Sequence, residues 1–310
     1  MKTPIHKMQL NLNENHLFIK RDDLMPFSFG GNKYRKALHY FKQIDDENYN
    51  VVITTGSASS NHCRIVANMA RQRAIECIII SPKELEKNAL NRTLTHWLDA
   101  DVRVVPQTAM SDTIKTLIKE KQLEGKKPYY IKMGGHGYLG TKAYVEAYQE
   151  ILDYAEHHNI SFDYLFFADG TGTTHAGLLA GKICQNKPTE IIGIGVLNDS
   201  ATAKPVIYER VNEYLKNHGY ATIKADSINY EDAYLMGGYG HDNQAIRDVI
   251  KATMQSEGIP LDPVYTGKGF YGMIETIKRR GIKGKNILFI HTGGAPIFFD
   301  LLNQENDKTI

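Results

Sequence analysis

The sequence has few cysteines, almost no excess charge and no long apolar run. Its 310 residues include three cysteines, Cys63, Cys77 and Cys184, an odd number without C-x-x-C spacing, which favours neither a disulfide framework nor a structural zinc site. Lysine and arginine number 37 against 35 aspartates and glutamates, a balance that argues against a dedicated nucleic-acid-binding protein. No stretch approaches the roughly 20 apolar residues of a membrane span, and the first residues contain no apolar signal segment. We therefore expect a cytoplasmic protein with no membrane, nucleic-acid or metal partner.

Length and composition are those of a folded globular protein. At roughly 150 residues per domain, 310 residues correspond to about two domains or one large one. Hydrophobic residues make up 42% and charged residues 23%, which excludes wholesale disorder. Neither a Pro/Ser-rich linker nor a repeat of 20 to 50 residues marks a domain border.

Short β-rich runs alternate with helical patterns along the chain. Predicted buried strands span residues 51–55, 77–81, 102–105, 129–132, 164–168, 191–196 and 287–291. Predicted helices span residues 61–73, 86–98, 111–120, 138–157, 175–183 and 243–256. Several strands are apolar throughout, which is typical of parallel strands covered on both faces. The alternation predicts an α/β fold with parallel sheets covered by helices and right-handed crossovers. Because ligands bind beyond the carboxyl ends of such strands, those junctions are where a site is expected.

The segment Gly30-Gly31-Asn32-Lys33-Tyr34-Arg35-Lys36 leads into a helix start. Its two glycines allow the backbone to approach another group closely. A lysine in a desolvated pocket can lose its proton and become an imine-forming nucleophile, whereas a lysine on a helix surface stays solvated. This segment alone favours the surface interpretation of Lys33.

The stretch from Thr54 to His62 follows a predicted strand with small hydroxyl residues and a helix start. Free N–H groups and the side chains of Ser60 and Asn61 can hold a carboxylate there. Simple N-capping by Ser59 or Ser60 explains the same pattern and is favoured by this stretch alone.

The stretch from Ala168 to Gly177 leaves an apolar strand and enters a helix of small residues, with N–H groups and hydroxyls able to cradle a phosphate. It lacks the P-loop lysine, and Gly170-Thr171-Gly172 lacks the third glycine of a dinucleotide fingerprint. A phosphate monoester site is therefore favoured over a turn without a ligand.

Three weaker segments also suit a pocket at the strand ends: Asp262-Pro263-Val264-Tyr265, His291-Thr292-Gly293-Gly294 and the glycine-rich loop around Tyr239. Each of them is equally compatible with an ordinary turn.

Taken in order, these segments resemble the pyridoxal phosphate enzymes of the tryptophan synthase β-type fold (fold type II). Within them, the resemblance is to the 1-aminocyclopropane-1-carboxylate (ACC) deaminase and D-cysteine desulfhydrase family. It covers most of the chain and rests on Lys20-Arg21-Asp22-Asp23, Gly30-Gly31-Asn32-Lys33, Ser60-Asn61-His62, Gly170 to Gly177, Asp262-Pro263-Val264-Tyr265 and His291-Thr292-Gly293-Gly294.

The resemblance implies pyridoxal 5'-phosphate as cofactor and a role for each segment. Lys33 would bind the cofactor aldehyde as an imine and shuttle the α-proton, with Asn32 near the ring oxygen. Ser60, Asn61 and His62 would bind the substrate carboxylate, and Ser60 would also move a proton. Tyr265 and Tyr239 would be the catalytic and substrate-binding tyrosines of the pocket. The phosphate would be held by Gly170, Thr171, Gly172, Thr173 and Thr174.

Two positions favour elimination over deamination within this family. The deaminases carry glutamate where this chain has Thr266 and leucine where it has Thr292. A carboxylate at the pyridine nitrogen would keep that nitrogen protonated, as ring opening requires, whereas a hydroxyl supports that proton less. The predicted function is α,β-elimination on a small amino acid, most simply D-cysteine, giving pyruvate, ammonia and sulfide.

Other functions remain open at this stage. Ser59 and Thr173 depart from the family pattern, which usually has glutamine and glycine there, so substrate and chirality are undecided. β-Replacement or deamination of another β-substituted D- or L-amino acid uses the same residues. A non-catalytic binding or regulatory protein of this fold, or an unrelated nucleotide binder, are further alternatives.

The resemblance also implies two lobes with the cofactor between them. We expect a large domain from residues 1–39 and 141–310, a small α/β domain from residues 40–140, and a homodimer.

Overall fold

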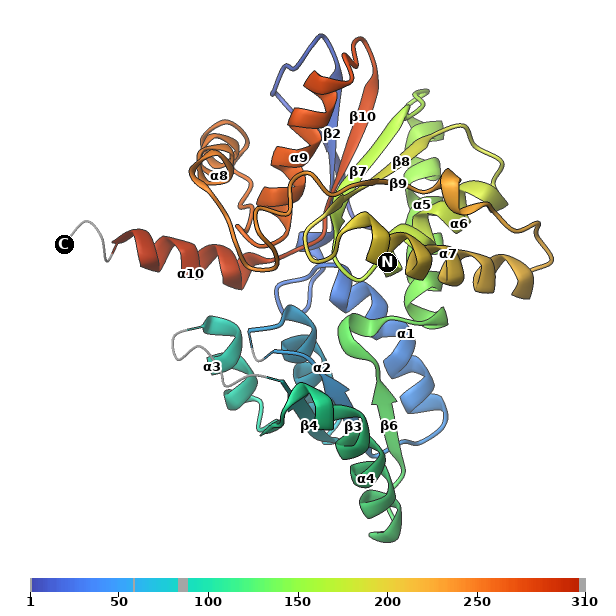
Figure 1. Ribbon diagram of the computed structural model, residues 1–310, viewed down its shortest axis with the longest axis vertical. Helices are drawn as coiled ribbons and strands as arrows, with labels where there is room; N and C mark the ends of the chain where they lie inside the picture. The colour runs from blue at the N-terminus through green and yellow to red at the C-terminus, as the bar shows by residue number, and fades with distance from the viewer. Residues whose placement is uncertain (1, 58, 83–88, 307–310) are drawn as a thin grey trace.

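The computed structural model describes residues 2–57, 59–82 and 89–306, and these ranges form two lobes, each built around its own sheet (Figure 1). The larger sheet has the strand order β1 (Ile5–Lys7), β2 (His16–Arg21), β10 (Asn286–His291), β7 (Tyr164–Asp169), β8 (Glu190–Gly195) and β9 (Asn229–Glu231). Neighbouring strands are parallel except for the antiparallel pair β1 and β2.

The smaller sheet is wholly parallel, with the order β5 (Asp101–Val104), β4 (Glu76–Ser81), β3 (Val51–Thr55) and β6 (Pro128–Ile131). Every residue of β3 is buried, as expected for a central strand covered on both faces. The helices of this lobe are α2 (Asn61–Gln72), α3 (Leu90–Trp97) and α4 (Met110–Leu123).

The remaining helices belong to or enter the larger lobe. They are α1 (Asn32–Asp46), α5 (Tyr138–His157), α6 (Thr173–Cys184), α7 (Ser200–Asn217), α8 (Gln244–Glu257), α9 (Thr266–Arg279) and α10 (Ala295–Asn306). In Figure 1, α1 runs from the upper lobe into the lower one, while α10 projects to one side.

All seven predicted strands are present, with ends that shift by at most one residue. Five predicted helices match α2, α4, α5, α6 and α8, and the sixth is present as α3, although residues 86–88 of that prediction lie outside the described residues. The pattern missed β1, β2, β9, α7, α9 and α10.

Helix α9 was missed because glycines at three of its positions weaken the helical pattern. Packing explains them. A Cβ atom at Gly269 would lie 2.9 Å from Ala168 Cβ in β7, and one at Gly272 would lie 2.5 Å from Ile194 Cγ2 in β8. The glycines therefore let α9 lie directly against the sheet.

The proposed domain borders at residues 40 and 140 fall inside helices, α1 and α5 respectively. We keep the division into residues 1–39 with 141–310 and residues 40–140 as a proposal, since these helices connect the lobes. None of the helices described between residues 2 and 306 has the length and apolarity that crossing a membrane requires. Among the same described residues, no three His, Cys, Asp or Glu side chains are grouped to hold a metal ion.

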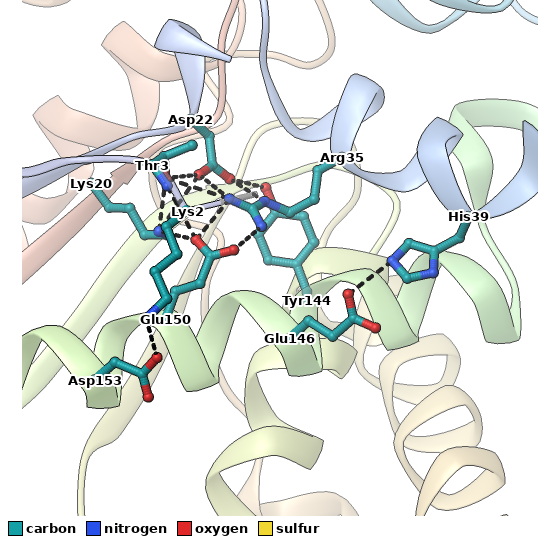
Figure 2. A network of polar contacts seen from close by, with 10 residues as sticks. All are labelled: Lys2, Thr3, Lys20, Asp22, Arg35, His39, Tyr144, Glu146, Glu150 and Asp153. Atoms are coloured by element: carbon teal, nitrogen blue, oxygen red, sulfur yellow. Dashed lines mark hydrogen bonds and ion pairs between the residues drawn. The ribbon is translucent and has the colours of Figure 1, made fainter. Parts of the chain in front are cut away.

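A buried network of charges joins β2, α1 and α5 (Figure 2). Arg35 of α1 donates to Asp22 (Nη2 to Oδ1, 2.9 Å) and to Glu150 of α5 (Nη1 to Oε1, 2.6 Å). Lys20 of β2 donates to Glu150 Oε2 at 2.6 Å and to Thr3 Oγ1 at 2.7 Å. Two cations thus face two carboxylates in the interior, where each charge depends on the others for its solvation.

Tyr144 of α5 completes this network by donating its hydroxyl to Asp22 Oδ2 at 2.8 Å. Burial alone would raise the pKa of Asp22, but Arg35 and Lys20 outweigh burial and hold the pKa of this carboxyl far below its usual value. Asp22 is therefore ionised at neutral pH, and Asp22 and Glu150 together fix α1 through Arg35.

Replacing Asp22 with asparagine should destabilise the fold by about 3–5 kcal/mol, because it leaves buried cations short of a carboxylate. The midpoint of denaturant unfolding measures this. Asp153→Asn is the matched control, since Asp153 lies on α5, the helix that carries Glu150, and pairs with Lys2 at the surface. The control should unfold close to wild type, and an equally stable Asp22→Asn variant would contradict the structural role of the network.

Candidate active site

A cleft of about 370 Å³ lies at the carboxyl ends of strands from both sheets. Its walls include residues that follow β3, β7 and β10, together with the first turn of α1. Nine predicted site residues with side chains line it: Asn32, Lys33, Ser60, Asn61, Thr171, Thr174, Tyr239, Tyr265 and Thr292. The predicted glycine Gly170 lines it as well. The structure therefore brings the separate sequence segments into one site.

Lys33 is the second residue of α1 and lines the cleft. The start of α1 is pinned, because Asn32 N donates to Thr292 O at 2.9 Å and Gly31 N donates to Asp22 O at 2.8 Å. The Lys33 amine has one long contact, at 3.4 Å, to the carbonyl oxygen of Gly134. A Cβ atom at Gly134, which has φ +66°, would lie 3.2 Å from Nζ, so glycine leaves room for this amine.

Burial lowers the pKa of the Lys33 amine to about 8. Within the described ranges, no carboxylate lies within salt-bridge distance of it. A considerable fraction is consequently neutral near physiological pH, and only the neutral amine attacks an aldehyde. The solvated-surface interpretation of Lys33 does not fit this position.

Lys36, one helical turn beyond Lys33, was missed by sequence reasoning. It lines the same cleft and is only 1% exposed. Its ammonium lies 5.6 Å from the centre of the Tyr144 ring and has no hydrogen-bond acceptor or carboxylate partner among the described residues. The signal in the sequence was the i, i+3 spacing, which places both lysines on one face of α1. Burial lowers the pKa of this amine well below its usual value, and an anionic ligand beside it would stabilise the protonated form.

The loop between β7 and α6 supplies the rest of an anion site. Asp169 shapes it: Oδ1 accepts from Gly172 N at 3.0 Å, and Oδ2 lies 3.0 Å from His175 Nδ1. Gly172 has the left-handed φ of +74° and is followed by the first turn of α6, whose N–H groups lack acceptors within the helix. Thr171 and Thr174 face the cleft at this point, so the loop offers several donors to a phosphate.

Gly172 and Thr173 do not line the cleft themselves. Thr173 is fully buried, and its hydroxyl accepts from Arg210 Nη1 of α7 at 3.0 Å. The same Arg210 nitrogen also donates to the carbonyl oxygen of Thr171. Arg210, a second residue that the sequence did not single out, therefore supports the loop from behind and adds positive charge to it.

On the opposite side of the cleft, α2 begins with Ser60 as its N-cap residue, whose Oγ accepts from His62 N at 3.2 Å. Capping and ligand binding are thus not exclusive here, because Ser60 and Asn61 also line the cleft. His62 does not line it. Its ring is 2% exposed, with Nε2 2.8 Å from Thr54 Oγ1, so a direct side-chain contact with substrate is not supported by this geometry. Ala58 of this loop lies outside the described residues.

The two predicted tyrosines meet in the cleft, with their hydroxyl oxygens 2.6 Å apart. Burial raises the pKa of Tyr265 well above its usual value and raises that of Tyr239 as well. Both phenols stay protonated at neutral pH, so the pair can donate and relay a proton.

The two threonines that favoured elimination are placed differently. Thr292 lines the cleft, whereas Thr266 is fully buried behind its wall. The Thr266 hydroxyl donates to Asp262 Oδ2 at 2.7 Å and accepts from Asp262 N at 2.8 Å. Its predicted contact with a cofactor is therefore not supported, because its hydrogen-bonding capacity is used inside the protein.

The cleft fits pyridoxal phosphate in two independent respects. The amine of Lys33, whose pKa burial lowers to about 8, suits its aldehyde. The amine of Lys36 lines the cleft together with donors of the loop after β7 and has no anion partner among the described residues, which suits its phosphate. These residues would hold the cofactor between the lobes, where ligand sites are commonly found.

Comparison with known proteins agrees with this fit. The model of the family of pyridoxal-phosphate dependent enzymes matches residues 1–293. The chain is 33% identical over 291 residues to the D-cysteine desulfhydrase of Salmonella typhi, covering 91% of this chain and 88% of that relative. A solved structure of an ACC deaminase homologue superposes with a TM-score of 0.86 at 32% identity, covering 98% of this chain and 93% of the other. O-ureido-L-serine synthase superposes with a TM-score of 0.68 at 14% identity and shares the fold.

These matches confirm the predicted two-lobed α/β fold of type II. The cleft suits an aldehyde at Lys33 and a phosphate at Lys36, and the family model matches most of the chain. This protein therefore belongs to the family of pyridoxal-phosphate dependent enzymes and uses pyridoxal phosphate as its cofactor.

Proposed function

We propose that this enzyme is a lyase that carries out α,β-elimination on D-cysteine, with water, to give pyruvate, ammonia and hydrogen sulfide. The observation that carries this proposal is the cleft wall at Thr292, which offers a hydroxyl and no carboxylate. Asp169 is the one acidic residue among the cleft's described lining residues, and its oxygens accept from Gly172 and His175. Asp262, behind the wall, accepts from Thr266 and from backbone N–H groups.

This wall favours elimination because it offers little support to a proton on the ring nitrogen of the cofactor. When bound, pyridoxal phosphate supplies an electron sink for the electrons left on the substrate Cα. A carboxylate in the wall would hold a proton on the ring nitrogen and favour a long-lived carbanion, as opening a cyclopropane ring requires. Thr292 gives weaker support, which suits prompt loss of a leaving group from Cβ. Similarity to the D-cysteine desulfhydrase of Salmonella typhi supports the same substrate.

We assign a separate role in this reaction to each group of cleft residues. Lys33 binds the cofactor and, once substrate has displaced it, its amine takes the proton from Cα, for which a pKa near 8 is suitable. Ser60 and Asn61 bind the substrate carboxylate at the start of α2. The Tyr239 and Tyr265 pair provides a proton to the departing sulfur.

The direct test is to supply D-cysteine and L-cysteine to the holoenzyme while assaying sulfide and pyruvate. We expect both products in equal amounts, preferentially from the D-isomer. Lys33→Ala should reduce the rate by roughly 10³-fold or more, because it removes the base and the cofactor link. Lys42→Ala, at an exposed lysine of the same helix, is the matched control and should retain activity.

Other outcomes distinguish the alternatives. Consumption of D-cysteine that yields a new amino acid when a second thiol is added would indicate β-replacement. Cofactor binding without release of keto acid from a panel of D- and L-amino acids would indicate a non-catalytic protein.

The pKa of Lys33 gives a second prediction, for protein freed of cofactor. Because burial lowers the pKa to about 8, the neutral amine should be half-populated near pH 8 rather than near the value of about 10.4 for an ordinary lysine. Labelling with an amine-selective reagent at increasing pH, quantified by peptide mass spectrometry, should show Lys33 modification reaching half its maximum near pH 8. A rise only near pH 10 would contradict the desolvated site.

The loop that carries Tyr239 is held by Lys268 of α9. This lysine is fully buried and donates to Leu235 O at 2.9 Å and Gly238 O at 3.0 Å. Four residues of the loop, Met236, Gly237, Gly238 and Gly240, have left-handed φ values between 53° and 130°. Such a backbone needs an external anchor to hold one conformation.

Lys268→Met should therefore lower kcat/KM for D-cysteine by roughly 10- to 100-fold, through misplacement of Tyr239, while the cofactor absorbance is retained. Steady-state kinetics with spectra of the purified variant measure both quantities. Lys278→Met is the control, because Lys278 lies on the same helix but pairs with Glu275 at the surface. Unchanged kinetics in Lys268→Met would show that the loop needs no anchor.

The family resemblance further supports a homodimer that works in the cytoplasm. Cys63, Cys77 and Cys184 are free thiols, which fits a reducing compartment. Light scattering coupled to size exclusion tests the dimer, and a monomeric mass would refute it.

A further inference from the structure

Arg64 is a buried cation without a counter-charge. It lies on α2, one turn after Asn61, and is 1% exposed. Among the residues that the structure describes, no carboxylate lies within salt-bridge distance of its guanidinium, which sits 5.3 Å from the centre of the Phe29 ring. Burying an unpaired guanidinium is costly, so the position calls for a function.

The hydrogen bonds of Arg64 connect three segments beside the cleft. Nε donates to Asn91 Oδ1 of α3 at 2.7 Å, and Nη1 donates to Ser28 Oγ at 2.6 Å and to the Ser28 carbonyl oxygen. Nη2 reaches Asn61 Oδ1 at 3.4 Å. The planar fork of the guanidinium can serve several acceptors at once, which a lysine cannot do with the same geometry.

The amide oxygen of Asn61 is thereby used inside the protein. Its Oδ1 accepts from Asn91 Nδ2 at 2.9 Å as well as from Arg64, and Asn91 Nδ2 also donates to Ser59 O at 2.9 Å. Asn91 is fully buried. The Asn61 amide nitrogen has no acceptor among the described residues, and Asn61 lines the cleft. Only the donor end of the amide is left for a ligand.

We propose that Arg64 is a positioning residue that, together with Asn91, orients the Asn61 amide so that its nitrogen donates to the substrate carboxylate. This role rests on the proposed function, in which Asn61 binds that carboxylate. Arg64 in this way determines selectivity for amino acids over simple amines.

The test compares two ligands of the holoenzyme that differ only by the carboxylate. D-alanine carries the carboxylate but no leaving group, and ethylamine lacks the carboxylate. Dissociation constants come from the change in cofactor absorbance on titration. Arg64→Met should weaken D-alanine binding by roughly 10- to 100-fold, the loss expected for a charge-assisted hydrogen bond, and leave ethylamine binding unchanged. Arg71→Met, at an exposed arginine of the same helix that pairs with Asp99, should change neither.

A double variant tests whether Arg64 acts through Asn61. If it does, adding Arg64→Met to Asn61→Ala should weaken D-alanine binding no further than Asn61→Ala alone. Asn91→Ala removes one of the two donors to Asn61 Oδ1 and the acceptor of Arg64 Nε. It should reproduce the selective loss, and it replaces Arg64→Met as the test if that variant does not fold. Melting curves and cofactor absorbance verify folding of each variant.

Three results would overturn the proposal: equal losses for both ligands, which indicate a purely structural role; additive losses in the double variant; or wild-type D-alanine affinity in both Arg64→Met and Asn91→Ala. These results are separable from failure of the proposed function. A wild-type enzyme that does not eliminate D-cysteine, but whose Arg64→Met variant selectively loses D-alanine, would refute the reaction and support the positioning role.

Discussion

Everything in the active site depends on how α1 is fixed, and the buried charges around Arg35 fix it. Arg35 follows Lys33 by two residues, about 200° around the helix, so the lysine faces the cleft while the arginine faces the interior. Arg35, Asp22 and Glu150 exchange hydrogen bonds of 2.6 to 3.1 Å that tie α1 to α5 and to the residues after β2. Such a network contributes little net stability compared with apolar packing, but breaking it is costly, so it permits one placement of α1.

With α1 in this place, basic side chains lie at both ends of the cleft. At one end Lys36 and Arg210 gather around the loop after β7, where a phosphate would bind. At the other end Arg64 stands behind Asn61, where a carboxylate would bind. Lys33 lies between these ends, with burial keeping its amine easily deprotonated. The cleft therefore offers donors to a phosphate at one end, an amine to an aldehyde in the middle, and a donor to the substrate carboxylate at the other end. The low solvent exposure of the site strengthens each of these interactions.

Sequence reasoning succeeded where local patterns decide structure. The parallel strands are apolar runs such as Leu165 to Phe167, so they were found with nearly correct ends. It failed at β2, where Lys20 and Arg21 are charged yet buried. Lys20 pairs with Glu150, which is distant in the sequence, and Arg21 pairs with Asp23 just after the strand. It failed at α9 because its glycines are set by contact with the sheet. In each case tertiary packing overrode local propensity.

The candidate site shows the same division. Motif order brought Lys33, Asn61 and Tyr265 into one cleft, but it could not show which way a side chain points. His62 and Thr266 sit in matching motifs yet hydrogen-bond inside the protein, to Thr54 and Asp262. Lys36 ends the segment that begins at Gly30 but was given no role, and Arg64 belongs to no segment that the sequence singled out. Only their burial without a counter-ion reveals them. Missing partners, unlike motifs, are visible only in three dimensions.

The central claim is that Lys33, and not the more deeply buried Lys36, is joined to the cofactor. Reducing the holoenzyme with borohydride fixes the cofactor to whichever amine holds it, and peptide mass mapping then identifies that residue. The structure predicts the added mass on Lys33 alone. Added mass on Lys36, or on neither lysine while the imine absorbance disappears, would contradict this account of the site.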